Sequence, residues 1–542
     1  MDRILEKLRS LYGDKADIIY PEINNIINHF QNKKIREEEL TEKDVVLITY
    51  GDQFRDDDKY LRYLKRFCDE FFKGYISTIH ILPFFPYSSD DGFSVIDYRK
   101  VKEDLGDWED IEDLSKDYKL MFDFVCNHIS SKSEWFQGYL KGDKKYKDYF
   151  IEMDPNIDLS DVVRPRALPL LTPFDTKDGK KYLWTTFSED QIDLNYKSPE
   201  LFLDMIKILL FYIEKGADLI RLDAIAYLWK EICTPCIHLR ETHTVIQLLR
   251  NILDKVAPEV KIITETNVPH KDNISYFGDG YNEAQLVYQF PLPPLILYTF
   301  KKHDSTAFNA WAKTIKPFSS KTTYFNFLAS HDGIGLNPLR GIVDEKEIEN
   351  LVEITERRGG LVSYKYNTNG TKSPYELNIS YFNALSDEDE DEEIKIKKFI
   401  NAYGIILVLQ GVPGIYIHSI LGSENYYDGV KATGQNRSIN REKFDYERIR
   451  EELKDRDSRR YRIYSSFIKL LDTRKNSRVF SPNSEQEILE LDNRVIAISR
   501  KYQDEKLLAI HNITPGSVSL KIDIGDLDLD PYEFVWLRYS SE

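Results

Sequence analysis

Residues 216–227, Gly-Ala-Asp-Leu-Ile-Arg-Leu-Asp-Ala-Ile-Ala-Tyr, decide the fold that this sequence predicts. Before them, Ser198-Pro199 opens a long apolar segment that ends at Lys215-Gly216. Ser as N-cap, Pro at the first helical position and Gly after the last turn are typical helix boundaries. The apolar strand that follows carries Arg221 and Asp223 at its end. A helix that leads straight into a buried strand indicates a βα repeat with a parallel sheet.

Three other apolar segments end in ionisable residues in the same way: Leu120 to His128, Ile262 to Asn267, and Tyr324 to Asp332. In a barrel of βα units, the carboxyl ends of the strands face the active site. The pattern therefore predicts an α/β fold, a (β/α)8 TIM barrel. A structural alternative for Arg221 and Asp223 is a buried ion pair that only joins two strands.

The composition of the 542-residue chain limits its domains and its partners. The length allows a barrel with appended parts. A net charge of −17 disfavours nucleic acid and anionic membranes, because these bind clustered Lys and Arg. The charged residues 1–7 lack a signal-peptide core, and the apolar stretch 399–417 is interrupted by Asn, Gln, Gly and Pro. We expect no membrane span.

Only four cysteines occur, which favours a reducing, cytoplasmic setting. Cys233-Thr-Pro-Cys236 has the spacing of a redox motif or of half a zinc site, but no second pair completes a metal site. We expect reduced thiols near the barrel mouth and no metal.

The pattern along the chain divides it into six segments. It also predicts eight barrel strands: 44–50, 76–83, a strand that ends at His128, strands that carry Asp223 and Glu265, 285–290, a strand that leads to His331, and 414–417. The expected segments are 1–128 (two N-terminal helices and the first part of the barrel), 129–195 (a polar, irregular insert), 196–332 (barrel with the catalytic strands), 333–393 (a second insert), 394–477 (end of the barrel) and 478–542 (a small antiparallel β domain). Pro291 should break the chain. The acidic run 387–393 should be a solvated helix start or loop.

An Asp and a Glu at strand ends can act on opposite sides of a glycosidic bond. In the retaining mechanism one carboxylate forms a covalent glycosyl-enzyme, while the other acts as acid and then base, with about 5–5.5 Å between them. Arg221, on the same strand face as Asp223, should keep that carboxyl ionised. Glu265 should instead have a raised pKa. Asp332, His128 and His331 suit hydroxyl recognition and transition-state support.

Two segments outside the strands carry further candidates. The loop 84–93 offers aromatic rings to stack on a sugar and an Asp for its hydroxyls; the alternative is a solvated turn. Arg164-Pro165-Arg166 could present two guanidinium groups together to a phosphate, which Arg binds bidentately. The alternative is a pair of exposed surface arginines.

The four strand-end segments resemble the four signature regions of the α-amylase superfamily, glycoside hydrolase family 13. Arg164-Pro165-Arg166, the Asp90–Phe93 loop, Gln191 and Tyr375–Asn378 further resemble the sucrose phosphorylase subfamily. This resemblance extends from about Asp44 to the C-terminal domain. It implies Asp223 as nucleophile, Glu265 as acid/base and Asp332 as transition-state stabiliser. It implies Asp90, Phe93, His128, Phe187, Gln191, Arg221, His331, Glu376 and Arg441 around the substrate, and Arg164, Arg166 and Tyr375 around phosphate.

Segments 229–243 and 266–270 look closer to glucosylglycerate and glucosylglycerol phosphorylases, and 164–174 is longer than the motif of the sucrose enzymes. The resemblance thus implies a retaining glucoside phosphorylase that uses 2-O-α-D-glucosylglycerate and inorganic phosphate and gives α-D-glucose 1-phosphate and glycerate. Glucosylglycerol, sucrose and sucrose 6-phosphate are the alternative substrates. No cofactor is implied. The carboxylate of glycerate would need a further cation, which Arg240 or Arg340 could supply unless they are surface residues.

Two other function classes are open to the sequence. A hydrolytic α-glucosidase would use the same carboxylates with water, but the arginine pair and Tyr375 argue against it. A non-catalytic barrel that binds a ligand or a transporter would usually lack a catalytic carboxylate or carry a membrane span. Asp223, Glu265 and Asp332 are all present.

Overall fold

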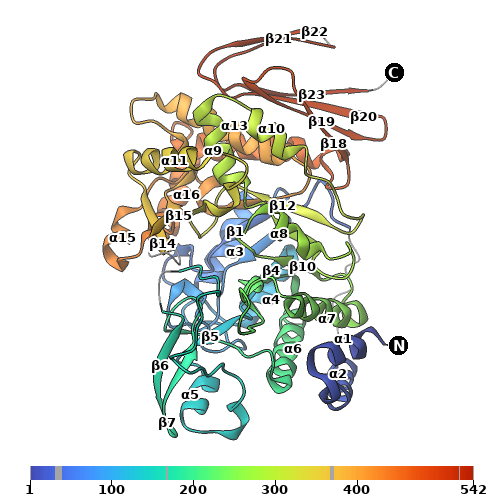
Figure 1. Ribbon diagram of the computed structural model, residues 1–542. Coiled ribbons are helices and arrows are strands. Elements are labelled where there is room, and N and C mark those ends of the chain that lie inside the picture. Colours follow the sequence, from blue (N-terminus) through green and yellow to red (C-terminus); the bar gives the residue numbers. More distant parts are fainter. Residues whose placement is uncertain (1, 31–38, 167–168, 367–370, 524, 541–542) are drawn as a thin grey trace.

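A closed barrel of parallel strands forms the centre of the protein (Figure 1). The computed structural model describes residues 2–30, 39–166, 169–366, 371–523 and 525–540. In chain order the eight barrel strands are β1 (Val46–Thr49), β3 (Thr78–Ile81), β4 (Lys119–Phe124), β9 (Ala217–Leu222), β10 (Lys261–Thr264), β11 (Leu286–Tyr288), β12 (Thr323–Phe327) and β16 (Val412–Tyr416). Each pairs with its neighbours in parallel, and β1 closes the barrel by pairing with both β3 and β16. The predicted TIM barrel is confirmed.

The barrel strands are buried on both faces, which explains their continuous apolar sequences. Helices cover the outside of the barrel. Among them are α3 (Tyr60–Phe71), α4 (Trp108–Asp117), α6 (Pro199–Glu214), α7 (Arg240–Val256), α9 (Leu292–Lys302), α10 (Thr306–Ala312), α13 (Glu392–Val408) and α17 (Arg459–Lys475). Within the described ranges, no helix has the length and apolar composition needed to cross a membrane.

Helix α6 delivers the chain into β9 as the sequence predicted. The Ser198 hydroxyl accepts a hydrogen bond from the Leu201 N–H (3.3 Å), and Pro199 occupies the first helical position. Lys215 ends the helix, and Gly216 follows with a φ of 105°, a conformation that residues with a Cβ avoid. These local signals set the point at which β9 begins.

Some expected boundaries are wrong. Strand β4 ends at Phe124, and His128 begins a separate strand, β5 (His128–Ser130), because the chain bends at Asn127. The eighth strand ends at Tyr416 and α14 (Ile417–Ile420) follows it. Pro291 does not break the chain but is the N-cap of α9, whose first turn tolerates prolines because its N–H groups have no helical partner.

The first excursion leaves the barrel after β4. Strands β5 and β8 (Gln191–Asp193) pair at its base, and β6 (Leu171–Thr176) and β7 (Gly179–Trp184) form a hairpin beyond them. Helix α5 (Glu134–Leu140) packs against β6 of this hairpin. The sequence predicted an irregular insert, and the hairpin shows that it is more ordered. In Figure 1 it lies at the opposite end of the molecule from the C-terminal strands.

The second excursion follows β12. Strands β13 (Ile334–Gly335), β15 (Lys372–Asn378) and β14 (Leu361–Tyr366) form a small sheet, and α11 (Glu345–Arg357) precedes β14. The acidic run predicted as a helix start ends at α13, where Asp391 caps the helix by accepting from the Glu393 N–H. The chain returns to the barrel through α13 and β16.

An antiparallel sheet ends the chain (Figure 1). Its strands are β18 (Glu485–Leu489), β19 (Val495–Tyr502), β20 (Glu505–Asn512) and β23 (Phe534–Ser540), and β21 (Val518–Ile522) pairs with β22 (Gly525–Leu529) beside it. Buried Arg500 of β19 donates to the Val408 carbonyl, and buried Arg474 of α17 donates to that of Leu407. These contacts satisfy the last carbonyls of α13 and fix the sheet to the barrel.

The remaining elements are short or lie at the edges. The N-terminal helices α1 (Arg3–Tyr12) and α2 (Ala16–His29) lie against α6 and α7. The others are α8 (His270–Ile274), α12 (Tyr381–Leu385), α15 (Tyr427–Thr433), α16 (Tyr446–Lys454), the paired β2 (Phe54–Arg55) and β17 (Phe444–Asp445), and the 3-10 turns η1 (Gly13–Lys15), η2 (Asp90–Gly92), η3 (Lys144–Tyr146), η4 (Ile225–Tyr227), η5 (Ser275–Phe277), η6 (Asn337–Leu339), η7 (Asn436–Asn440) and η8 (Arg478–Phe480).

Removing the N-cap of α6 should destabilise the protein measurably. Ser198→Ala should lower the free energy of unfolding by about 1 kcal/mol, whereas Ser198→Gly should cost only a few tenths, about the usual difference between these residues at an N-cap. Chemical denaturation of both variants beside the wild type measures this. Equal losses for Ala and Gly would contradict the role of the Ser198 hydroxyl as a cap.

Candidate active site

A cavity lies at the carboxyl ends of the barrel strands. Its floor is formed by Arg221 of β9, by Asp223 and Glu265, which directly follow β9 and β10, and by Asp332 after β12. The predicted residues that line its walls are Asp90, Phe93, His128, Arg166, Phe187, Gln191, His331, Tyr375 and Glu376. The barrel topology therefore gathers most of the predicted site residues.

Arg221 is buried between two carboxylates. Its Nη1 lies 2.7 Å from Asp223 Oδ1 and also donates to Asp123 of the neighbouring strand β4. His80 Nε2 lies 2.7 Å from the other oxygen of Asp123. Burial raises the pKa of Asp123, but the charges of Arg221 and His80 outweigh burial and lower it. The ion pair predicted for Arg221 and Asp223 exists, and it forms part of the cavity floor.

Asp223 and Glu265 share one electrostatic environment. Burial raises the pKa of Asp223 to about 8, against the charge of Arg221, and the charge of Glu265 adds to the rise. Burial also raises the pKa of Glu265, whose Oε2 accepts the Ala224 N–H at 3.0 Å. The raised pKa of Glu265 matches the prediction. The expectation that Arg221 keeps Asp223 ionised is met only in part: burial outweighs the arginine and raises the pKa of Asp223, so one proton is shared between the two carboxyl groups. The pair therefore holds a proton near neutral pH.

Asp332 has the opposite character. Burial raises its pKa, but Arg437 Nη1, 2.6 Å from Asp332 Oδ1, and His331 lower it well below the usual range. Asp332 is thus ionised while the Asp223–Glu265 pair carries a proton. Carboxyl groups whose environments separate their pKa values in this way can take different roles in one reaction.

Both predicted histidines are neutral at physiological pH. Burial lowers the pKa of His128 to about 4 and that of His331 to about 3. His128 Nε2 donates to the Phe93 carbonyl at 2.9 Å, and the ring of His331 stacks on Phe93 with 4.8 Å between centroids. Neutral imidazoles can hydrogen-bond sugar hydroxyls without adding charge to the site.

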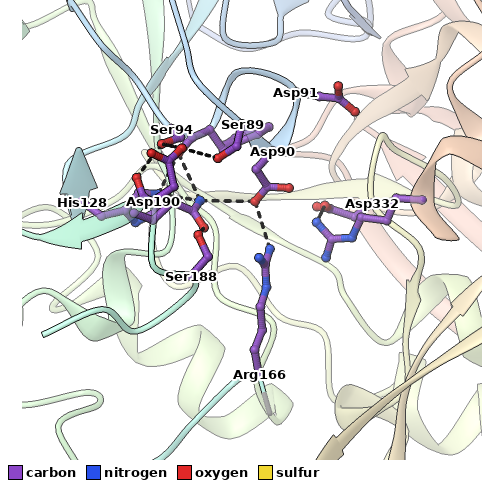
Figure 2. A network of polar contacts seen from close by, with 12 residues as sticks. Ser89, Asp90, Asp91, Ser94, His128, Arg166, Ser188, Asp190 and Asp332 are labelled. Carbon is purple, nitrogen blue, oxygen red and sulfur yellow. Dashed lines mark hydrogen bonds and ion pairs between the residues drawn. The ribbon is translucent and has the colours of Figure 1, made fainter. Parts of the chain in front are cut away.

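Asp90 connects the loop after β3 to the first excursion (Figure 2). Its Oδ2 accepts from Arg166 Nη2 at 3.0 Å and from Gln191 Nε2 at 3.2 Å. Burial raises the pKa of Asp90, but the arginines around it, Arg166 first, hold it well below the usual range. The guanidinium group of Arg166 also lies over the Phe187 ring, 5.6 Å from its centroid. Asp90 and Arg166 therefore face the cavity as a partly buried ion pair.

Tyr375 and Glu376 reach the cavity from β15 of the second excursion. Glu376 Oε1 accepts the Gly333 N–H at 2.5 Å. A Cβ at Gly333 would lie only 2.5 Å from Glu376 Cγ, so this close approach requires a glycine. The contact holds the second excursion against the segment that carries Asp332.

Sequence reasoning missed Arg437. It lies in η7 and lines the cavity between Asp332 and Glu376, with Nη2 3.1 Å from Glu376 Oε1. The only signal was its place one helical turn before Arg441, in a segment rich in Asn and Gln. It is the cation that binds the two carboxylates Asp332 and Glu376 together.

Two predicted residues lie outside this cavity. Arg441 Nε donates to the His331 carbonyl at 2.8 Å, and Arg441 pairs with Asp91 and lines a neighbouring cavity, because η7 turns it away from Arg437. Arg164 is exposed and lines a shallow surface pocket near Pro169. The chain bends at Pro165-Arg166, so the two guanidinium groups are not presented together as predicted.

The two arginines considered for a substrate carboxylate also lie elsewhere. Arg240 is exposed at the start of α7, and Arg340 pairs with Glu345. The four cysteines are free thiols, and Cys236 Sγ donates to the Glu231 carbonyl at 3.2 Å in the loop after β9.

Three comparisons with known proteins relate this chain to a family and to individual enzymes. The family model "Alpha amylase, catalytic domain" matches residues 61–344. The chain is 51% identical to glucosylglycerate phosphorylase of Spirochaeta thermophila, covering 88% of this chain and 81% of that protein. It is 48% identical to glucosylglycerate phosphorylase of Escherichia coli over 99% of this chain and all of that protein. The crystal structure of sucrose 6F-phosphate phosphorylase from Thermoanaerobacter thermosaccharolyticum superposes with a TM-score of 0.78 at 23% identity, covering 94% of this chain and 100% of that chain.

The raised pKa of Asp223 should make this residue a source of instability at high pH. The folded protein binds a proton at Asp223 more tightly than the unfolded chain, so stability is lost as pH rises from about 4 to about 8. Asp223→Asn should therefore raise the free energy of unfolding at pH 8 by at least about 1.4 kcal/mol, one pKa unit, and change it little near pH 4. Thermal and chemical unfolding at both pH values measure this.

Asp332→Asn serves as the control, because the pKa of Asp332 is lowered. This variant should lose stability at pH 8, and the loss should shrink as the pH falls below 4. Destabilisation of Asp223→Asn at pH 8 would contradict the raised pKa of Asp223.

Proposed function

The chain belongs to the α-amylase family, and we propose that it is a retaining phosphorylase of 2-O-α-D-glucosylglycerate. It transfers the glucosyl unit to inorganic phosphate and gives α-D-glucose 1-phosphate and glycerate. The observation that carries this proposal is the similarity to glucosylglycerate phosphorylases over nearly the whole chain. The charges within the cavity support it in the following way.

In the first half of the proposed reaction Asp223 attacks the anomeric carbon. Glu265 gives its proton to the glycosidic oxygen, the bond to that oxygen breaks, and glycerate leaves as a covalent glucosyl-Asp223 ester forms. The proton shared by the Asp223–Glu265 pair must then lie on Glu265. Arg221, in direct contact with Asp223, favours this arrangement by stabilising the charge on the nucleophile.

In the second half phosphate takes the place of glycerate. Glu265 accepts a proton from the phosphate, and the phosphate oxygen attacks the anomeric carbon from the side that glycerate left. The ester bond to Asp223 breaks, so two inversions retain the α configuration. Arg166 and Tyr375 are the proposed phosphate ligands, and both line the cavity. Ionised Asp332 is the proposed stabiliser of the oxocarbenium-like transition state.

The glucosyl unit is proposed to lie against Asp90, Phe93, His128 and His331. Phe187 and Gln191 border the same part of the cavity. Arg441 is then proposed to position His331 through its hydrogen bond to the His331 carbonyl, without direct contact with the sugar. This changes the role that the resemblance implied for Arg441.

The carboxylate of glycerate needs a positive charge in the cavity. Among the described residues, the arginines that line it are Arg166, Arg221 and Arg437. Arg166 is the proposed phosphate ligand, and the side chain of Arg221 is only 3% exposed, whereas that of Arg437 is 24% exposed. We therefore assign the glycerate carboxylate to Arg437, with Glu376 beside it for the glycerate hydroxyl. Three of the five N–H donors of Arg437 are engaged, which leaves two for a ligand.

The cellular setting and the domain division are part of the same proposal. A reducing, cytoplasmic location suits the four free thiols. The inserts at 129–195 and 333–393 are proposed as the two parts that cover the barrel mouth, with 478–542 as a separate β domain.

Release of α-glucose 1-phosphate tests the function. Purified protein given glucosylglycerate and phosphate should release it, and omission of phosphate should reduce turnover at least 10-fold. Glucosylglycerol, sucrose and sucrose 6′-phosphate serve as competing donors in parallel reactions. Free glucose formed at the same rate without phosphate would identify a hydrolase, and preference for another donor would reassign the acceptor.

Arg166→Gln should weaken phosphate binding specifically. Because a hydrogen bond to a charged group contributes about 1.5–3 kcal/mol, the KM for phosphate should rise about 10- to 100-fold. Arg164→Gln is the matched control, since it removes the same charge two residues away on the exposed side of the bend. Steady-state kinetics with varied phosphate measures both variants, and an equal rise in KM for the two would argue against Arg166 as a phosphate ligand.

A further inference from the structure

Asp190 has an unusual set of partners just outside the cavity (Figure 2). Its Oδ2 accepts hydrogen bonds from Ser88 (2.5 Å), Ser89 (2.5 Å) and Ser94 (2.9 Å), and its Oδ1 accepts from Ser131. In the described part of the chain no Lys, Arg or His pairs with this carboxylate. Four hydroxyl donors on one carboxylate are a strong constraint, because each charge-assisted bond is shorter and stronger than a neutral one.

Three of these serines belong to the loop after β3, and they bracket a strained turn. Asp90 and Asp91 have φ values of 53° and 47°, and Gly92 follows with 113°. Left-handed backbone at a residue other than glycine costs roughly 1–3 kcal/mol and persists only when its surroundings hold it. Ser88 and Ser89 precede the turn and Ser94 closely follows it, so a single carboxylate holds both of its ends.

The turn carries two residues of the proposed glucosyl subsite. Asp90 points to Arg166, and Phe93 stacks on His331. Gln191, the residue after Asp190, donates to both Asp90 Oδ2 and the Phe93 carbonyl at 3.2 Å. The single hydroxyl proton of Ser94 is shared between Asp190 Oδ2 and the Asp190 carbonyl, which lies 2.8 Å from Ser94 Oγ. Two consecutive residues of the first excursion, Asp190 and Gln191, thus hold the turn through hydrogen bonds.

We propose that Asp190 is a positioning residue for the glucosyl subsite: by clamping both ends of the left-handed turn 90–92 it fixes Asp90 and Phe93 where the sugar binds. This inference rests on the proposed function only in that the cavity binds a glucosyl unit. It does not depend on which acceptor is used. The alternative is a purely structural role, in which Asp190 only anchors the excursion through Ser131. The test must distinguish this role from positioning of the glucosyl subsite.

α-Glucosyl fluoride is the appropriate probe, because it carries the glucosyl unit and its fluoride leaves without glycerate; phosphate, supplied at a fixed concentration, then takes the glucosyl unit from Asp223 and frees the enzyme for the next turnover. Asp190→Ala should lower kcat/KM for fluoride release at least 10-fold, mainly through a higher KM, since small misplacements of binding groups cost large factors in rate. In phosphorolysis the KM for phosphate should rise less than the KM for glucosyl fluoride, because Asp190 reaches the proposed phosphate ligand Arg166 only indirectly, through Asp90. Asp190→Asn, which keeps one acceptor oxygen, should fall between Ala and the wild type.

Ser94→Ala and Ser131→Ala form a matched pair. Each deletes one hydroxyl from the same carboxylate, but only Ser94 belongs to the loop that carries the turn. Ser94→Ala should raise the KM for glucosyl fluoride at least threefold, and Ser131→Ala should leave it within twofold of the wild type. This pair decides the question even if Asp190→Ala does not fold.

Equal effects of Ser94→Ala and Ser131→Ala, or a fall in kcat alone with an unchanged KM, would overturn the proposal and leave a structural anchor. If the wild type releases fluoride but does not use glucosylglycerate, the acceptor assignment fails while the test of Asp190 stands. If the wild type releases no fluoride, the glucosyl subsite itself is wrong, and the proposal for Asp190 falls with it.

Discussion

The rest of the site depends on the ion pairs that one buried guanidinium group, that of Arg221, makes with two carboxylates. Arg221 lies inside β9, in register with Asp123 of β4, and reaches forward to Asp223. Asp123 is the ionised partner, and removing it should cost about 3–5 kcal/mol, because the buried guanidinium group would lose its compensating charge. The same arginine therefore joins two adjacent strands, through Asp123, and positions the carboxyl group of Asp223 after β9. Stability and the position of the nucleophile are properties of one cluster.

The fold and the floor of the site could be predicted because their signals are local. Ser198, Pro199 and Gly216 mark the ends of one helix, and the strand after it must then end near Asp223. In a closed parallel barrel, all residues at strand ends share one rim, so Glu265 and Asp332 follow by topology. The pKa of Asp223 could not be predicted in this way, since it depends on how deeply the whole cavity is buried.

The walls of the site were harder to predict, because their geometry depends on partners far apart in the sequence. Arg164 and Arg166 look equivalent in the sequence, but a bend separates them, and only Arg166 meets Asp90. Arg437 acquires its place from Asp332 and Glu376, which come from two different segments. The pair Asp90-Asp91 before Gly92 permits a left-handed turn. Asp190, the residue that holds this turn, lies in the first excursion, about 100 residues along the chain. Nothing in the sequence around Asp190 indicates this contact.

The closure of the barrel also determines when the site can exist during synthesis. β1 pairs with β16, which begins at Val412, so this pairing cannot form until the last barrel strand has been synthesised. At about 5–20 residues per second, the ribosome needs roughly 20–70 s to make the intervening chain. Until then one edge of β1 has no strand beside it, and unpaired edges favour association with other chains. The partly made barrel therefore keeps an exposed strand edge for a time set by translation, long after the segments that carry Asp223 and Glu265 have been made.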